Sequence, residues 1–461
     1  MSLESEEIHQ LLEWAIDWQH DISRNSTPDA FETSERSSSP WARHRSNYAF
    51  EKLAKETFPL YELGIAPSDI KSDVLGIIQD LAFESDDEVD WDEYHYPVEE
   101  SIEEDGLVST YEAKVNQVIA DIGQGEQLET TFYFPLNIQW AGSPPEIEIF
   151  DITLQPISES EWSEQLSEFR RFPDTFGTGT VEALCEDTDY SYWTTTIQSK
   201  GRSYAADKLN TALNLLCAKI NYTLYCWEIQ RLSERDQSSP GNPRWSWIQE
   251  PMAVLTAGTD HPLEVAITNR SSPRTVDLDW TNGDLPERFE EIPSFNYGAD
   301  GLTGIFQDAL LEYQRAMVEK ERQNAFFGFW RSIEELTLAG HGEKGEIVDR
   351  AMWAYSVSAS EAHEIFFKTI TEQLYDTRNK WVHEANWGDI WEIHERVAKY
   401  LADSLIQLYI DDFYGLDQNV VAEAFRYARM EEPQREKKQR QAEHRLQALS
   451  ELNNIEQDCS S

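Results

Sequence analysis

The sequence has few cysteines, few basic residues and no long apolar run, and each scarcity argues against a class of protein. Its 4 cysteines show no Cys-x-x-Cys spacing, which disfavours a thiolate zinc site and a disulfide framework. No window approaches the roughly 18 uninterrupted apolar residues that a membrane-spanning helix requires. The first residues, Met-Ser-Leu-Glu-Ser-Glu-Glu, lack the basic and apolar segments of a signal peptide. We therefore expect a cytoplasmic protein without membrane contact.

Basic residues are outnumbered along the whole chain. Against 86 Asp and Glu there are 38 Lys and Arg, which gives a net charge of −48. Charge of one sign on this scale makes the compact state repel itself unless salt screens it. The composition is typical of a halophile's cytoplasmic protein, whereas a protein that binds cationic partners would favour one concentrated acidic patch. The acidity is only a weak argument against nucleic-acid binding, because molar salt reduces the counterion-release contribution for any protein.

The length of 461 residues predicts two or three domains rather than one core. Apolar residues at helical spacing indicate a mainly helical region over residues 1 to 120. Residues 121 to 300 are predicted to form an α+β domain with a sensing or regulatory role. Its expected elements are strands at 130 to 140, 146 to 154, 192 to 198, 263 to 268 and 275 to 280, and a helix from about residue 203. No phosphate-loop or dinucleotide fingerprint is present, so we expect no cofactor.

From residue 302 the sequence turns helical. Residues 301 to 420 are predicted to form an all-α antiparallel helical bundle, because short connections join successive amphipathic helices. Residues 421 to 461 form a charged helical or disordered tail. Its basic stretch at residues 435 to 440 is interpreted as a solvated helical extension or as an RNA-contacting arm. The expected fold class is therefore α+β multidomain, with the helical bundle following a mixed α+β region.

One helical segment carries residues suited to catalysis. It reads Leu-Tyr-Asp-Thr-Arg-Asn-Lys-Trp-Val-His from residue 374 to 383. On an ideal helix Asn379 and His383 share one face, while Arg378 is rotated by roughly 140° from His383. Arg378 can join the other two only through its long side chain, a local helix irregularity or a second subunit.

These residue types fit the cleavage of RNA by its own 2′-hydroxyl. A histidine can take or give the proton near neutral pH. An arginine presents a rigid fork of donors to phosphate oxygens. This reaction requires no metal, and no Asp/Glu cluster in the sequence clearly forms a metal site.

The segment resembles the HEPN superfamily, and specifically its ApeA-like branch. Three stretches match in order, at residues 329 to 336, 346 to 352 and 374 to 383, and the last is similar to the branch's Tyr-Asp-x-Arg-polar-x-x-Val-His signature. The resemblance implies that Arg378 and His383 are the two motif residues, that Asn379 is the polar residue after the arginine, and that Glu334 is the acid of an upstream helix. It also implies a homodimer in which two motifs form a metal-independent ribonuclease site.

Two functions follow as hypotheses. In the first, the chain is an endoribonuclease that acts in antiviral defence or as a toxin. His383 is its general acid or base, Arg378 the phosphate anchor and Asn379 a positioning residue, while Glu334 and Tyr375 are further candidates for orienting the site. In the second, the bundle is a non-catalytic module that dimerises and binds RNA or protein. The intact Arg-Asn-x-x-x-His sequence favours the enzyme.

Overall fold

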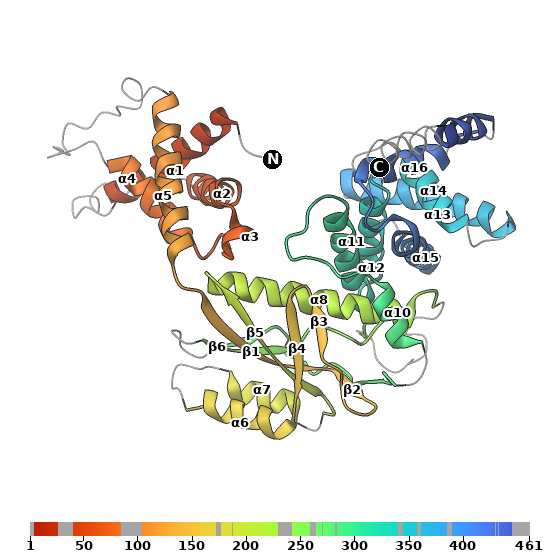
Figure 1. The fold of residues 1–461 in the computed structure, drawn as a ribbon, viewed down its shortest axis with the longest axis horizontal. Helices are drawn as coiled ribbons and strands as arrows, with labels where there is room; N and C mark the ends of the chain where they lie inside the picture. Colours follow the sequence, from red (N-terminus) through yellow and green to blue (C-terminus); the bar gives the residue numbers. More distant parts are fainter. Residues whose placement is uncertain are drawn as a thin grey trace, which may run out of the picture.

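The chain folds into a mixed α+β region followed by a largely helical C-terminal region (Figure 1), which confirms the predicted fold class. The computed structural model describes residues 4–25, 40–83, 104–171, 177–186, 188–228, 242–258, 264–269, 271–281, 284–339, 344–356, 361–384, 390–428, 430–431 and 433–444.

The first part of the chain is helical, as the spacing of apolar residues predicts. Its helices are α1 (Ser5–Asn25), α2 (Pro40–Thr57), α3 (Leu60–Leu63), α4 (Lys71–Phe83) and α5 (Glu104–Gln124). They enclose a core of their own, to which Leu12, Leu53, Ile78 and Tyr111 contribute fully buried side chains. Helix α5 continues past residue 120, where the sequence suggests a boundary. It leads directly toward the first strand.

A six-stranded sheet follows, in the order β3-β4-β5-β1-β6-β7, and every neighbouring pair is antiparallel. The bounds are β1 (Leu128–Leu136), β3 (Ile147–Ile149), β4 (Ile152–Ile157), β5 (Ser191–Ser199), β6 (Ala253–Gly258) and β7 (Glu264–Ile267). A separate parallel pair joins β2 (Ile138–Trp140) to β8 (Val276–Leu278). The first two predicted strands are each divided in two, at Asn137 and at Phe150, whose φ is 56°.

Helices cover both faces of the sheet (Figure 1). Helices α6 (Glu159–Phe169) and α7 (Thr178–Cys185) lie on one face, and the long helix α8 (Arg202–Tyr225) lies on the other. Side chains alternate along β5, because successive residues of a strand point to opposite faces. Tyr192 packs in the core beneath α6 and α7, whereas Trp193 and Ile197 pack in the core that includes α8.

The C-terminal region shares that second core through α8. Its elements are α10 (Leu285–Glu291), α11 (Gly301–Val318), α12 (Arg322–Leu336), α13 (Lys344–Ser356), α14 (Glu361–Glu384), α15 (Glu392–Leu408), the π-helical turn η2 (Tyr409–Phe413) and α16 (Gln418–Ala428). One core cluster runs from Leu209 and Leu216 on α8 to Tyr313 on α11 and Leu401 on α15. The sheet and the C-terminal helices are therefore joined by packing, not only by the chain.

An aromatic cluster joins all three parts of the molecule. The ring of Tyr297, just before α11, lies 5.5 Å from Tyr61 on α3, 5.6 Å from Phe150 in the β3–β4 turn and 5.3 Å from Tyr204 at the start of α8. Edge-to-face contacts at such separations add about 0.5–1.5 kcal/mol each beyond burial. The N-terminal helices thus contact the loop that leads into the C-terminal region.

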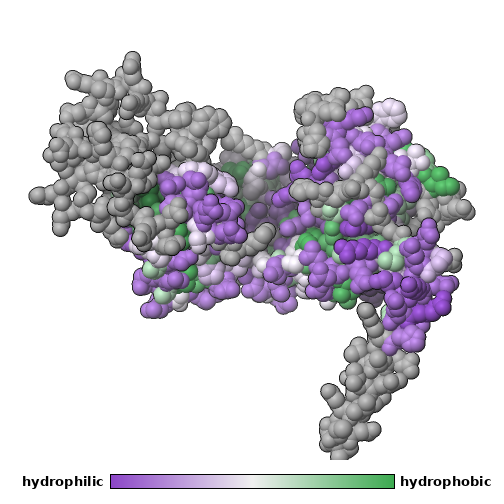
Figure 2. Space-filling view, turned by 90° about the horizontal axis from the view of Figure 1, so that it is seen from above, coloured by the Kyte–Doolittle hydropathy of each residue, from purple (hydrophilic) through white to green (hydrophobic). Residues whose placement is uncertain are grey.

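No helix within the described ranges is long and apolar enough to cross a membrane. The face seen from above is largely hydrophilic, with smaller apolar areas between (Figure 2).

Candidate functional site

The motif predicted from the sequence lies on α14, whose two faces differ sharply. Thr371 and Leu374 are fully buried, whereas Ile365 is 66% and Phe366 46% exposed. Positions 369, 372, 376 and 380 are exposed as well. Helix α14 therefore packs against its neighbours along one stripe and leaves the opposite stripe open.

Arg378 extends from α14 to α12. Its Nη2 donates to Oε2 of Glu334 at 3.2 Å and lies 3.0 Å from Oε1 of the same carboxylate. Its Nη1 donates to Oδ1 of Asn379 at 3.1 Å. Since a guanidinium carries five N–H donors, these contacts leave part of the fork for another anion. The arginine side chain remains 26% exposed, so such an anion can approach from solvent.

Glu334 is itself held in place. The indole Nε1 of Trp330, one turn earlier on α12, donates to Glu334 Oε1 at 2.8 Å. The Trp330 ring is fully buried, and its centroid lies 6.3 Å from that of Tyr375 on α14. The structure thus brings together Arg378, Asn379, Glu334 and, through Trp330, Tyr375. The buried indole of Trp330 on α12 thus orients the Glu334 carboxylate, and this carboxylate orients Arg378 on α14.

His383 lies on the same helix, but its side chain is outside the described residues. The backbone of α14 continues to Glu384. On an ideal helix position 383 follows Ile365 by five full turns. Arg378 faces α12 and Glu334. On an ideal helix it is rotated by roughly 140° from position 383.

The surroundings of Glu334 are acidic. Burial, followed by the charges of Asp308, Glu312 and Glu334, raises the pKa of the Glu335 carboxyl. Burial and then Glu312 likewise raise the pKa of Asp308. Carboxylates that already repel one another hold a nearby guanidinium more strongly, because each added cation lowers their mutual repulsion.

A second set of buried charges on α15 was not anticipated from the sequence. Glu395 is fully buried and accepts from Arg244 and, at 3.0 Å, from Trp245 Nε1. The only sequence signal is a charged residue on an otherwise apolar stripe, and its partners lie about 150 positions earlier. Buried charges are tolerated when they are paired in this way.

About two turns further along α15, Asp403 forms a second buried group. Its carboxylate accepts from Lys399 at 2.8 Å, from Tyr313 at 2.6 Å and from the backbone N–H of Trp227 at 3.0 Å. Burial, followed by the charge of Asp403, raises the pKa of Tyr313 well above its ordinary value. The phenol therefore stays protonated and donates. We interpret both groups as anchors that attach Trp227, Arg244 and Trp245 to α15.

No group of three or more His, Cys, Asp or Glu side chains that could hold a metal ion occurs in the part of the chain that the structure describes. Comparison of the chain with protein-family models, with curated proteins and with solved structures gives no match.

Proposed function

We propose that the C-terminal helices form a HEPN-like domain that acts as a metal-independent endoribonuclease in the cytoplasm. The observation that carries the proposal is the cluster of Arg378 with Asn379 and Glu334, on the helix that also carries His383. An arginine oriented by a carboxylate and an amide, yet open to solvent, is prepared to hold a phosphate. The resemblance of residues 374 to 383 to the ApeA-like signature supports the same function.

The proposed reaction is an attack of the ribose 2′-oxygen on the adjacent phosphorus. Arg378 stabilises charge on the phosphate oxygens, Asn379 keeps the guanidinium in place, and His383 takes the 2′-hydroxyl proton. The bond from phosphorus to the 5′-oxygen breaks, and this oxygen leaves as a hydroxyl after receiving a proton. The products are a 2′,3′-cyclic phosphate and a 5′-hydroxyl end.

Cleavage of total RNA by the full chain in 2 M KCl with EDTA tests the proposal. RNA should be cut and DNA left intact, because DNA lacks the attacking hydroxyl. His383→Ala and Arg378→Ala should each lower the rate by about 10²–10⁴. Arg378→Lys should rescue only partly, since an ammonium cannot reproduce the fork. Cleavage that continues in a folded His383→Ala protein would reject the assignment.

The second candidate is a non-catalytic module that dimerises and binds RNA or protein. The ion pair of Arg378 with Glu334 favours it, because a paired arginine between two helices also serves as a structural brace. In that case Arg378→Ala and Glu334→Gln would both lower the melting temperature, and no RNA would be cleaved. In either case we propose that the regions before residue 301 sense a trigger or restrain the C-terminal helices, with antiviral defence or toxin action as the setting.

A further inference from the structure

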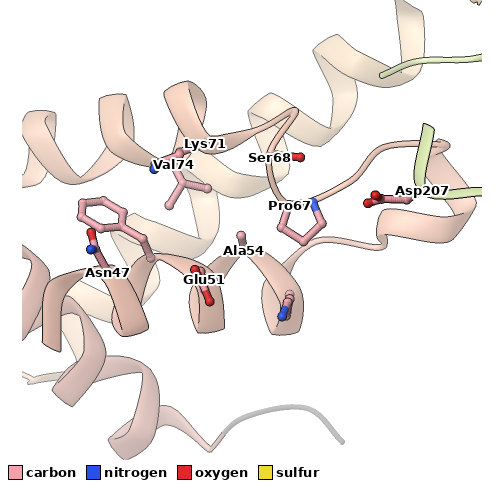
Figure 3. A pocket seen from close by; sticks show the side chains of 10 residues that line it. Asn47, Glu51, Ala54, Pro67, Ser68, Lys71, Val74 and Asp207 are labelled. Carbon is pink, nitrogen blue, oxygen red and sulfur yellow. The ribbon is translucent and has the colours of Figure 1, made fainter. Parts of the chain in front are cut away.

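A pocket of about 490 Å³ lies far from the Arg378 cluster, between the N-terminal helices and the start of α8 (Figure 3). Its size falls within the range of about 300–1,000 Å³ that small-molecule sites occupy. Helix α2 forms one wall, the loop before α4 and the first turn of α4 form the other, and Asp207 of α8 lies at one end. The N-terminal helices and α8, which belong to different hydrophobic cores, thus line one cavity.

One face of α2 supplies half of the lining. Asn47, Phe50, Glu51, Ala54 and Lys55 fall at positions i, i+3, i+4, i+7 and i+8 of the helix, which places them on a single stripe. The stripe combines an aromatic ring, an amide, a carboxylate and an ammonium group. Such a mixture suits a ligand that has a flat apolar part as well as charged and hydroxyl groups.

The cations of the pocket are unusual in so acidic a chain. Lys55 and Lys71 line it from opposite walls, and neither forms an ion pair with any residue in the described ranges. Glu51 and Asp207 balance their charge, so the pocket is formally neutral in a protein of net charge −48. An anionic group therefore meets less repulsion here than over most of the molecule.

Asp207 is suited to accept hydrogen bonds from hydroxyl groups. Burial, followed by the charge of Asp69, raises the pKa of its carboxyl. A partly buried carboxylate beside another carboxylate gains from a hydroxyl donor. Figure 3 shows Asn47 and Lys71 toward one end of the pocket and Asp207 at the other, with Pro67 and Ala54 between. The layout fits an elongated ligand with different chemistry at its two ends.

We propose that this pocket binds a mononucleotide. Lys55 and Lys71 hold the phosphate, and the ring of Phe50 stacks on the base. Glu51 accepts from the ribose hydroxyls, and Asp207 accepts from a donor group at the end of the ligand opposite Lys71. The charge of Asp207 also acts on Tyr297, so a ligand here lies beside the loop that leads into the C-terminal helices. The proposal stands whether or not those helices cleave RNA.

Calorimetric titration of the full chain with each of the four 5′-mononucleotides in 2 M KCl tests this. At least one should bind with a dissociation constant in the micromolar range, and at least tenfold more tightly than its nucleoside or inorganic phosphate alone. Lys71→Gln and Asp207→Asn should each weaken binding by about fivefold or more. Lys52→Gln on α2 is the control for Lys71→Gln, because it also removes one positive charge but lines a different depression.

The nuclease site could also hold a nucleotide, and a further variant separates the two sites. Arg378→Ala should leave the affinity unchanged if the ligand sits between α2 and α8. Binding that is lost in Arg378→Ala but survives in Lys71→Gln would place the nucleotide at the C-terminal site and overturn the proposal. The absence of binding by all four nucleotides would overturn it as well.

Discussion

Arg378 combines a structural contact with donors that are open to a ligand. Its contact with Glu334 joins α14 to α12, and its remaining donors are open to a phosphate. A structural brace needs only the first property, whereas an RNA-cleaving site needs both. The partial exposure of the side chain is therefore the feature that distinguishes this arginine from the fully enclosed Glu395 group, whose carboxylate has no access to solvent.

Lys219 of α8 offers a prediction about pH. It is 4% exposed and lies 4.3 Å from the ring of Phe289. Burial lowers the pKa of its ammonium to about 8, and Glu290 offsets this only in part. The pKa of an unfolded lysine is about 10.4. Between these two values the unfolded chain binds more protons, so the free energy of unfolding rises with pH.

Lys219→Met should therefore raise the free energy of unfolding at pH 7 by about 1–3 kcal/mol, because it removes the cost of a buried charge. The loss of the contact with Phe289 reduces this gain. The difference between variant and parent should shrink toward pH 10, where the folded lysine is already neutral. Urea unfolding at both pH values measures it. An equal gain in the free energy of unfolding at both pH values would show that the effect comes from packing.

At the scale of elements, Asp69 connects the N-terminal helices to α8. Its carboxylate accepts from the backbone N–H groups of Ser203 and Tyr204 at 2.8 and 2.9 Å. These N–H groups of the first helical turn have no acceptor within the helix. Gly201 at the N-cap position has no side chain that could accept from them. A Cβ atom at Gly201 would occupy the space of this carboxylate.

Gly201→Ala should accordingly displace Asp69 and lower the free energy of unfolding by about 1–3 kcal/mol. Gly76→Ala is the matched control. It lies within α4 with no atom near its added Cβ, and it should raise the free energy of unfolding by about 0.5–1 kcal/mol. Urea unfolding in 2 M KCl compares the two. A neutral Gly201→Ala would show that Asp69 contributes little to this junction.

The sequence predicts the elements whose pattern is local. Apolar spacing identifies α1, α8 and the helices from α11 to α15, and Glu334, Arg378 and Asn379 indeed lie together. It did not predict β6, nor the break at Asn137. There the side-chain amide donates to the carbonyls of Trp247 and Arg274, which lie 110 and 137 positions away. Partners so distant leave no trace in a local pattern, and the same holds for the Glu395 group.

The whole molecule should depend on salt for its stability. A net charge of −48 makes the folded chain repel itself. The Debye length falls from about 10 Å at 0.1 M to about 3 Å at 1 M. The melting temperature should therefore rise by several degrees between 0.1 and 2 M KCl, most steeply below 1 M. Calorimetry or circular dichroism measures it. An unchanged melting temperature would remove the halophilic interpretation.

We also expect the chain to form a homodimer through the exposed stripe of α14. Ile365 is 66% exposed on this stripe, and on an ideal helix position 383 follows it by five full turns. A partner helix across a two-fold axis would cover the isoleucine and bring two motifs together. Sedimentation in 2 M KCl should show a dimer. Ile365→Asp should yield a monomer, whereas Val420→Asp, at a 51% exposed position of α16, should leave the dimer intact.

Mixing two inactive variants tests whether the site is shared between protomers. Arg378 pairs with Glu334 of α12, and on an ideal helix position 383 is rotated from it by roughly 140°, so one helix separates the two groups that the chemistry needs. If each site takes its arginine from one protomer and its histidine from the other, Arg378→Ala and His383→Ala chains complement each other. Half of the dimers in a random mixture are mixed, and each mixed dimer has one intact site of two. RNA cleavage should then return to about a quarter of the parent rate. No recovery in a mixture shown to exchange subunits would confine each site to a single chain.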